Sequence, residues 1–307
     1  MAGGAPLIHS LLPWPFDRQY MQLALAGGLV VGACAPLIGA FLVQKRMSLI
    51  GDGIGHVAFA GVAMGLLLGL WPTWAALVVS VLGALAVDRL RARGGSSGDL
   101  VLALFFYAGI AAGVVLLGLG GSLNANLFSY MFGSILTVTG GDVVLIGAIG
   151  AAIVLSVIVA GRPLLAVVAD EEWARVAGVP VDGLNAGLSV LTAVTVVAGM
   201  RVVGILLVAA LMVLPVGAGQ LLARSFRGTL GWSAGIGMGS VIAGLVFARL
   251  WGLAPGGTIV LVAALSFALV SLAAARSRSD RWPRLRGDQG PVGPRPLGLG
   301  RAEPPGP

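Results

Sequence analysis

The feature that most constrains this chain is a series of apolar segments, each about as long as a bilayer is thick. A helix needs about 20 mostly apolar residues to cross the hydrocarbon core. Only 10% of the 307 residues are charged and 58% are hydrophobic, whereas soluble domains contain about a quarter charged residues. The chain is therefore predicted to be a membrane protein. Segments of sufficient length lie at roughly 20–43, 48–70, 72–91, 99–119, 142–161, 184–200, 202–222, 230–250 and 257–275.

These segments predict an all-α fold, a polytopic transmembrane helical bundle. It has nine spans, or eight if the polar second segment or the closely spaced pair within 184–222 does not cross fully. The short linkers leave no room for a soluble domain, so residues 20–275 are expected to form one transmembrane domain. Residues 1–19 are predicted to lie at the membrane interface. Residues 276–307, rich in Arg and Pro, are predicted to form a disordered cytoplasmic tail.

Positive charge alternates between the linkers. Every second linker is basic, as the positive-inside rule expects of cytoplasmic loops, so nine spans place the N-terminus outside and the C-terminus inside. The net charge of +7 is attributed to this bias toward cytoplasm and anionic membrane lipid, and no nucleic-acid partner is expected. The basic residues that define the pattern are Lys45, Arg46, Arg89, Arg91, Arg93, Arg162, Arg175, Arg224 and Arg227.

The inventory of motifs argues against an enzyme. The sequence contains no P-loop, GxSxG, HExxH or CxxC pattern, so it offers no recognisable machinery for nucleotide hydrolysis or proteolysis. Cys34 is the only cysteine, which excludes an internal disulfide and a thiolate metal cluster. A transporter or channel is the favoured class.

Asp52 and His56 are the candidate functional residues, because Asp52 is the only acid well inside a predicted span. An intramembrane aspartate costs about 2.5–3.5 kcal/mol on insertion scales and by default marks a pathway or a pair. Four residues apart on a helix, the two side chains share a face. They could approach one cation together, or Asp52 could hold the tautomer of His56 while the free nitrogen binds the ion. A structural hydrogen bond between helices is the simpler alternative.

Three glycines follow on the same segment with small-xxx-small spacing, Gly61, Gly65 and Gly69. Such spacing lets two helices pack closely in a membrane. At 100° per residue, Gly61 and Gly65 point roughly away from His56. One face of this helix is therefore expected to pack against a neighbour while the other presents the polar pair. Asp52 and His56 are two ligands, whereas a closed zinc site usually has four. The weaker binding expected of two ligands suits a transported ion, which must leave the site again.

Two connections are expected to form short helices. The stretch 120–142 has an apolar middle, 127–136, that is too short to cross, so it is predicted to lie on or dip into the outer surface. In the interior loop 161–183, Asp170, Glu171 and Glu172 suit the start of a short helix that Gly178 ends. This helix is predicted to be a docking surface for a partner.

The motifs resemble those of the integral membrane permeases of bacterial ABC importers for zinc and manganese. The segments that carry the resemblance are "RMSLIGDGIGHVAFAGVAMGLLLG", "NLFSYMFGSILTVTGGDV", "DEEWARVAGV", "VVGILLVAALMVLPVGAGQLLARS" and "GGTIVLVAALSFALVS". It covers roughly residues 20–275. By this resemblance Asp52 and His56 match the polar pair along the metal path. Asp170, Glu171, Glu172, Ala174 and Gly178 fall in the loop that docks on the ATPase.

The resemblance implies a multi-pass permease subunit in the bacterial cytoplasmic membrane. A second copy of the chain would complete the path, a cytoplasmic ABC ATPase would hydrolyse ATP, and an extracytoplasmic metal-binding protein would deliver the ion. The chain itself would bind no cofactor; the transported ion is expected to be zinc first and manganese second. The alternatives are a stand-alone secondary metal carrier driven by an ion gradient, and a structural membrane subunit in which the Asp–His pair only packs.

Overall fold

The computed structural model describes residues 16–93, 98–120 and 125–279, and all its regular elements there are helices. The predicted all-α class is confirmed. The helices are α1 (Gln19–Gln44), α2 (Ile50–Leu67), α3 (Pro72–Ala92), α4 (Gly98–Leu119), α5 (Ala125–Phe132), α6 (Gly140–Ala169), α7 (Glu171–Val176), α8 (Val181–Gly199), α9 (Ile205–Leu222), α10 (Phe226–Trp251) and α11 (Pro255–Ser279).

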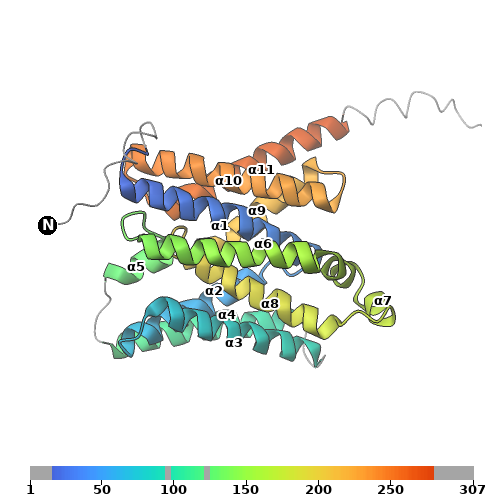
Figure 1. Ribbon diagram of the computed structural model, residues 1–307, viewed down its shortest axis with the longest axis horizontal. Coiled ribbons are helices and arrows are strands. Elements are labelled where there is room, and N and C mark those ends of the chain that lie inside the picture. The colour runs from blue at the N-terminus through green and yellow to red at the C-terminus, as the bar shows by residue number, and fades with distance from the viewer. Residues whose placement is uncertain (1–15, 94–97, 121–124, 280–307) are drawn as a thin grey trace, which may run out of the picture.

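Nine helices in the described part of the chain are long and apolar enough to cross a membrane. They include α2 and both α8 and α9, so the described helices agree with the larger of the two predicted span numbers. The two short helices lie at opposite ends of the bundle: α5 at the end where α1 starts, and α7 at the end where α11 finishes, on the far side of the bundle from α11 (Figure 1). The start of α1 and the end of α11 lie at opposite ends of the bundle (Figure 1), which agrees with an odd number of spans.

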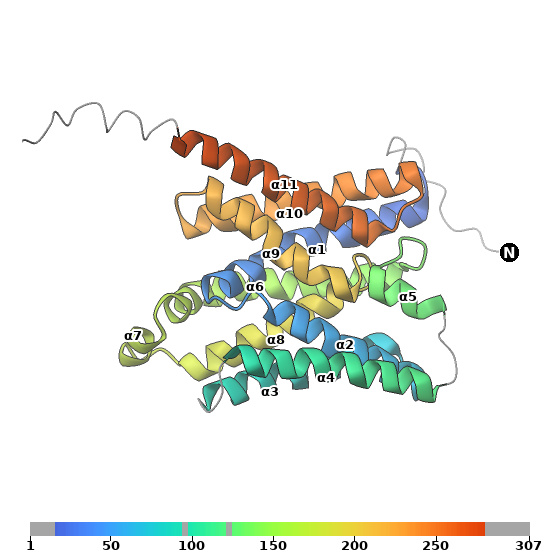
Figure 2. The same ribbon diagram turned by 180° about the vertical axis from the view of Figure 1, so that it is seen from behind.

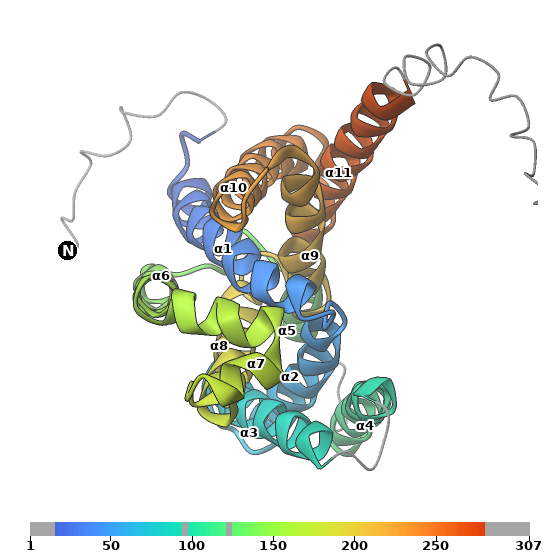
Figure 3. The same ribbon diagram turned by 90° about the vertical axis from the view of Figure 1, so that its right-hand side faces the viewer.

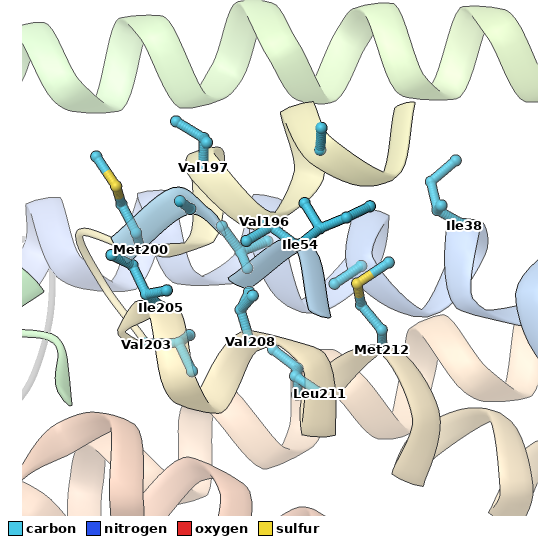
Figure 4. Packing of buried hydrophobic residues seen from close by; sticks show 14 of the residues in the cluster. Ile38, Ile54, Val196, Val197, Met200, Val203, Ile205, Val208, Leu211 and Met212 are labelled. Atoms are coloured by element: carbon cyan, nitrogen blue, oxygen red, sulfur yellow. The ribbon is translucent and has the colours of Figure 1, made fainter. Parts of the chain in front are cut away.

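The long helices form two groups. Helices α2, α3, α4 and α8 lie on one side of the molecule and α9, α10 and α11 on the other, with α1 and α6 between them (Figures 1 and 2). The two groups meet where α2 and α8 pack against α9. There Ile54 is surrounded by Val196, Met200 and Val208 (Figure 4), and all four side chains are almost fully buried.

Helix α2 is the most enclosed of the membrane-length helices. Of its most apolar 18-residue window, 72% is buried inside the chain, against 17% for α6 and for α11. The outer helices instead leave large apolar side chains exposed, such as Leu104 on α4 and Leu261 on α11. Because lipid is as apolar as these side chains, their exposure is the ordinary surface of a membrane protein. The helix with the polar pair is thus the central one.

Helix α6 extends further than the predicted span 142–161. It begins at Gly140, where the Thr139 hydroxyl accepts from the Asp142 N–H in a capping box, and continues past Pro163 to Ala169. Proline interrupts one backbone hydrogen bond and bends a membrane helix without ending it when neighbours re-satisfy the backbone. After the bend the last turns of α6 lie across the end of the bundle and lead into α7 (Figure 3).

The structure can be compared with three further boundaries that the sequence predicted. The short helix expected within 120–142 is present as α5. Helix α11 continues to Ser279, four residues past the end of the predicted transmembrane domain at 275. Most of the predicted interfacial segment, 1–15, and of the predicted tail, 280–307, lies outside the described residues.

Candidate functional site

The polar pair lies where α2 packs against α4. Asp52 is in the first turn of α2 and His56 is one turn further on, and both side chains are half-buried. A cavity of about 230 Å³ lies beside Asp52. It is lined by Leu49, Asp52, Gly53, Asp99, Leu102, Ala103, Phe106 and Tyr107.

Glycines on α4 allow the two helices to approach this closely. A Cβ added at Gly109 would lie 2.6 Å from the carbonyl carbon of His56, and one added at Gly113 would overlap the ring of Phe59. The His56 ring meets Phe106 edge to face, with ring centroids 4.2 Å apart. Between helices in lipid there is no hydrophobic driving force, so helix association depends on the close van der Waals packing that small residues permit. The imidazole is therefore held against α4 by packing.

Asp52 and His56 share a face of α2, as predicted, yet the structure gives no hydrogen bond or ion pair between these two described residues. Neither the structural Asp–His bond nor the fixing of the imidazole tautomer by Asp52 is therefore seen. No group of three or more His, Cys, Asp or Glu that could hold a metal is found within the described residues. One chain thus offers a carboxylate and an imidazole, and no closed site.

The opposite face of α2 packs on α3 through two of the three predicted glycines. A Cβ at Gly61 would lie 2.7 Å from the Ala76 Cα, and one at Gly65 would lie 2.9 Å from the Pro72 Cα. Gly69 differs, because α2 ends at Leu67. Its φ is +65°, and a Cβ there would meet nothing within 4 Å. Within this chain Gly69 serves the turn after α2 and not the helix contact.

The pair lies nearer one end of α2 than the middle of a span. Helix α2 starts at Ile50, four residues after the basic Arg46, and Lys45 pairs with Glu171 of α7, so Asp52 is close to the end of the bundle that holds α7. The cavity beside it is also lined by Asp99, which sits in the first turn of α4. Sequence reasoning did not connect Asp99, Phe106 or Tyr107 with Asp52, because they belong to a helix two spans further along.

The predicted docking loop forms α7, and its residues face in different directions. The Asp170 side chain accepts from the Trp173 N–H at 2.9 Å and caps the helix, and Gly178 has a φ of +79°, which ends it. Ala174 is fully buried against Val167 and Val181. These three residues shape the helix and seat it on the bundle.

The outward side of α7 is apolar as well as acidic. Trp173 is 63% exposed and Val176 is 89% exposed, and Glu171 and Glu172 line an open pocket with Arg175 and Val176. Trp173 and Val176 were not among the predicted docking residues. Exposed apolar residues on a helix at the predicted cytoplasmic end would have indicated a docking surface. Which residues of α7 are exposed depends, however, on the side of α7 that packs on α6, and the sequence does not specify that side.

A polar cluster joins α7 to the end of α1 and to α8. The Lys45 ammonium donates to Asn185 Oδ1 at 2.5 Å and lies 3.4 Å from Glu171 Oε2. The Asn185 amide in turn donates to Glu171 Oε1 at 3.3 Å. Arg175 donates to Asp182 at 3.0 Å. These residues line a cavity of about 610 Å³ together with Asp88, Arg89 and Arg91 of α3.

The fold and the site define a class of protein: a multi-pass helical membrane protein with a polar pair on its central helix and a short exposed helix at one end. Residues 17–274 match the model of the ABC 3 transport family. The chain belongs to this family, as the sequence motifs predicted.

Similar proteins cover nearly the same length. The manganese transport system membrane protein MntC of Halalkalibacterium halodurans is 33% identical over 265 residues, 85% of this chain and 90% of that one. The high-affinity zinc uptake system membrane protein ZnuB of Haemophilus influenzae is 31% identical over 247 residues, 80% and 94% of the two chains. The solved structure of PsaBC from Streptococcus pneumoniae in complex with Fab matches with a TM-score of 0.75 at 30% identity, over 83% of this chain and 91% of that chain.

Proposed function

We propose that the chain is the membrane-spanning permease subunit of an ABC importer that moves a divalent transition metal, zinc or manganese, across the bacterial cytoplasmic membrane. Family membership supports the class, and the relatives named for zinc and for manganese transport support the substrate. The observation that carries the proposal is the polar pair on α2. In an enclosed, otherwise apolar helix, Asp52 and His56 are the residues suited to a metal cation.

Both side chains suit a transported metal. Imidazole nitrogen is a good ligand for zinc and carboxylate oxygen is preferred by manganese, so the pair accommodates either ion. Asp52 borders a cavity and His56 lies one turn further on. Two such ligands offer weak ligation, which lets an ion both enter and leave.

A second copy of the chain would complete the path. One chain supplies two candidate ligands, and two chains meeting at this groove would supply four, the number usual in zinc sites. The side of α4 that borders the cavity also exposes Leu104 and Tyr107, apolar groups that suit a helix contact inside the membrane. We therefore include a homodimer in the proposal.

ATP hydrolysis belongs to a separate cytoplasmic ATPase that docks on α7, and delivery of the metal belongs to an extracytoplasmic binding protein. The absence of a P-loop from the sequence supports the first assignment. The exposed Trp173 and Val176 support α7 as the docking helix, because aromatic anchors are enriched in protein interfaces.

The test is metal uptake by cells that depend on this transporter, using radioactive zinc and manganese in turn. Asp52→Asn and His56→Ala are each expected to lower uptake about tenfold or more, since a metal–ligand contact is lost. The transporter should still assemble. Met64→Leu on the same helix is the matched control, because it conserves apolar volume and should leave uptake unchanged.

Two outcomes would contradict the proposal. Unchanged uptake of both metals in the Asp52 and His56 variants would remove the pair from the path. Uptake that persists without ATP and follows a proton gradient would indicate a secondary carrier.

A further inference from the structure

Lys45 is the only lysine in the chain, and it lies in the polar cluster beside α7. Its side chain is only 19% exposed. A largely buried ammonium is tolerated when it is paired and hydrogen-bonded. Lys45 meets this condition through Glu171 of α7 and Asn185 of α8, which also bond to each other. The three side chains form a closed triangle between three helices.

The triangle links α7 to a helix that is not its neighbour in the sequence. Helix α7 packs on α6 and α8, which flank it along the chain. Lys45 belongs to the end of α1, so its bonds to Glu171 and Asn185 tie α7 and α8 to the turn between α1 and α2. Arg175 extends the same network to Asp182.

The turn that follows Lys45 is tightly bonded. The Met47 N–H donates to the Leu42 carbonyl at 2.8 Å and the Arg46 N–H to the Val43 carbonyl at 3.0 Å. These two bonds, with Arg46 at a φ of +58°, make a Schellman motif. Met47 is buried in the core, and α2 begins three residues later. This bonded turn connects Lys45 to the first turn of α2, where Asp52 lies.

We propose that Lys45 is a positioning residue for transport, through which α7 sets the position of the first turn of α2 and hence the access of the ion to Asp52. This inference rests on the proposed function, in which an ATPase docks on α7. The Lys45 ammonium touches neither the ion nor ATP; it acts through the Glu171–Asn185 contact and the Schellman turn.

The test uses the complete transporter, with its ATPase and binding protein, in proteoliposomes. The measured quantity is the number of zinc or manganese ions imported per ATP hydrolysed. Lys45→Met removes the charge and keeps the length of the side chain. We expect assembly and an ATP hydrolysis rate within about twofold of wild type, but about tenfold fewer ions per ATP, a typical size for coupling between sites.

Two further variants separate positioning from a general effect on the fold. Lys45→Arg keeps the cation and should restore most of the lost import per ATP. Arg91→Met is the matched control, since Arg91 lines the same cavity while its guanidinium packs beside Gly98. It should leave the ratio at the wild-type value.

The outcomes distinguish this inference from the proposed function. Without ATP-dependent import by the wild type, the proposed function itself is wrong. With normal wild-type import, an unchanged ratio of ions to ATP in Lys45→Met overturns the role of Lys45. If Lys45→Met does not assemble, the ratio is measured on Asn185→Leu, which removes the Lys45 acceptor without stranding a charge; a fall of about fivefold supports the inference, and an unchanged ratio overturns it.

Discussion

At the scale of single residues, the close contact between α2 and α4 depends on two glycines of α4, because a glycine has no Cβ. Gly109 lies against the backbone of His56, and Gly113 lies against the ring of Phe59. The glycines thus fix the distance between the helix with the polar pair and the helix that lines the other side of the cavity. A single methyl group at Gly109 tests this arrangement.

Gly109→Ala is expected to destabilise the protein by about 1–3 kcal/mol, the usual cost of overpacking a rigid contact. The added Cβ would lie 2.6 Å from the carbonyl carbon of His56, and neither backbone can yield without moving a helix. Metal uptake should fall as well, because α4 and its Phe106 would shift away from His56. Thermal unfolding in detergent and uptake in cells are the two measurements.

Gly118→Ala is the control for this prediction. Gly118 is on the same helix, α4, but a Cβ there would meet nothing within 4 Å. Since alanine is favoured over glycine in helices by up to about 1 kcal/mol, this variant should be as stable as wild type or slightly more so. A greater loss of stability at Gly118 than at Gly109 would contradict the assigned packing.

At the scale of elements, one side of α7 packs against the bundle and the other side is exposed. Ala174 is fully buried, while Trp173 and Val176 are among the most exposed large apolar side chains outside the membrane-length helices. Truncating a buried aromatic anchor of an interface typically costs 2 kcal/mol or more. The docking role proposed for α7 therefore predicts a large effect at Trp173.

Trp173→Ala should weaken association with the ATPase about thirtyfold, the equivalent of about 2 kcal/mol. The measurement is the amount of ATPase that co-purifies with the permease. Leu261→Ala is the control, because Leu261 is similarly exposed but lies on the membrane-length α11. Equal co-purification of the ATPase with Trp173→Ala and with wild type would exclude α7 as the main anchor.

At the scale of the whole molecule, the enclosed α2 borders a surface groove beside α4, the cavity that Asp52 and Asp99 line. A single copy leaves Asp52 half-buried at that groove, with only His56 as a further candidate ligand on the same face. We expect the working transporter to contain two copies of this chain. Native mass spectrometry of the complex extracted from membranes should give two permease chains, and a complex with one permease chain would contradict this expectation.

Much of this architecture can be predicted from short stretches of the sequence. Each span needs about 20 apolar residues in a row, so a count of eight or nine spans and the short helices α5 and α7 were predictable. The polar pair could also be found, because an acid in an apolar helix is costly and therefore conspicuous. The spacing of Gly61 and Gly65 predicted the close helix contact, although not that α3 would be the partner.

The sequence by itself therefore determined the class, the spans and the residues worth examining, because the bilayer imposes its requirements on each segment separately. Only the tertiary structure decided that α2 is the central helix, that Phe106 and Asp99 lie beside the polar pair, and that Gly69 stands outside the helix contact. The same holds for the triangle of Lys45, Glu171 and Asn185, whose members are up to 140 residues apart. Such contacts depend on the angles and depths at which helices cross, and no local pattern specifies them.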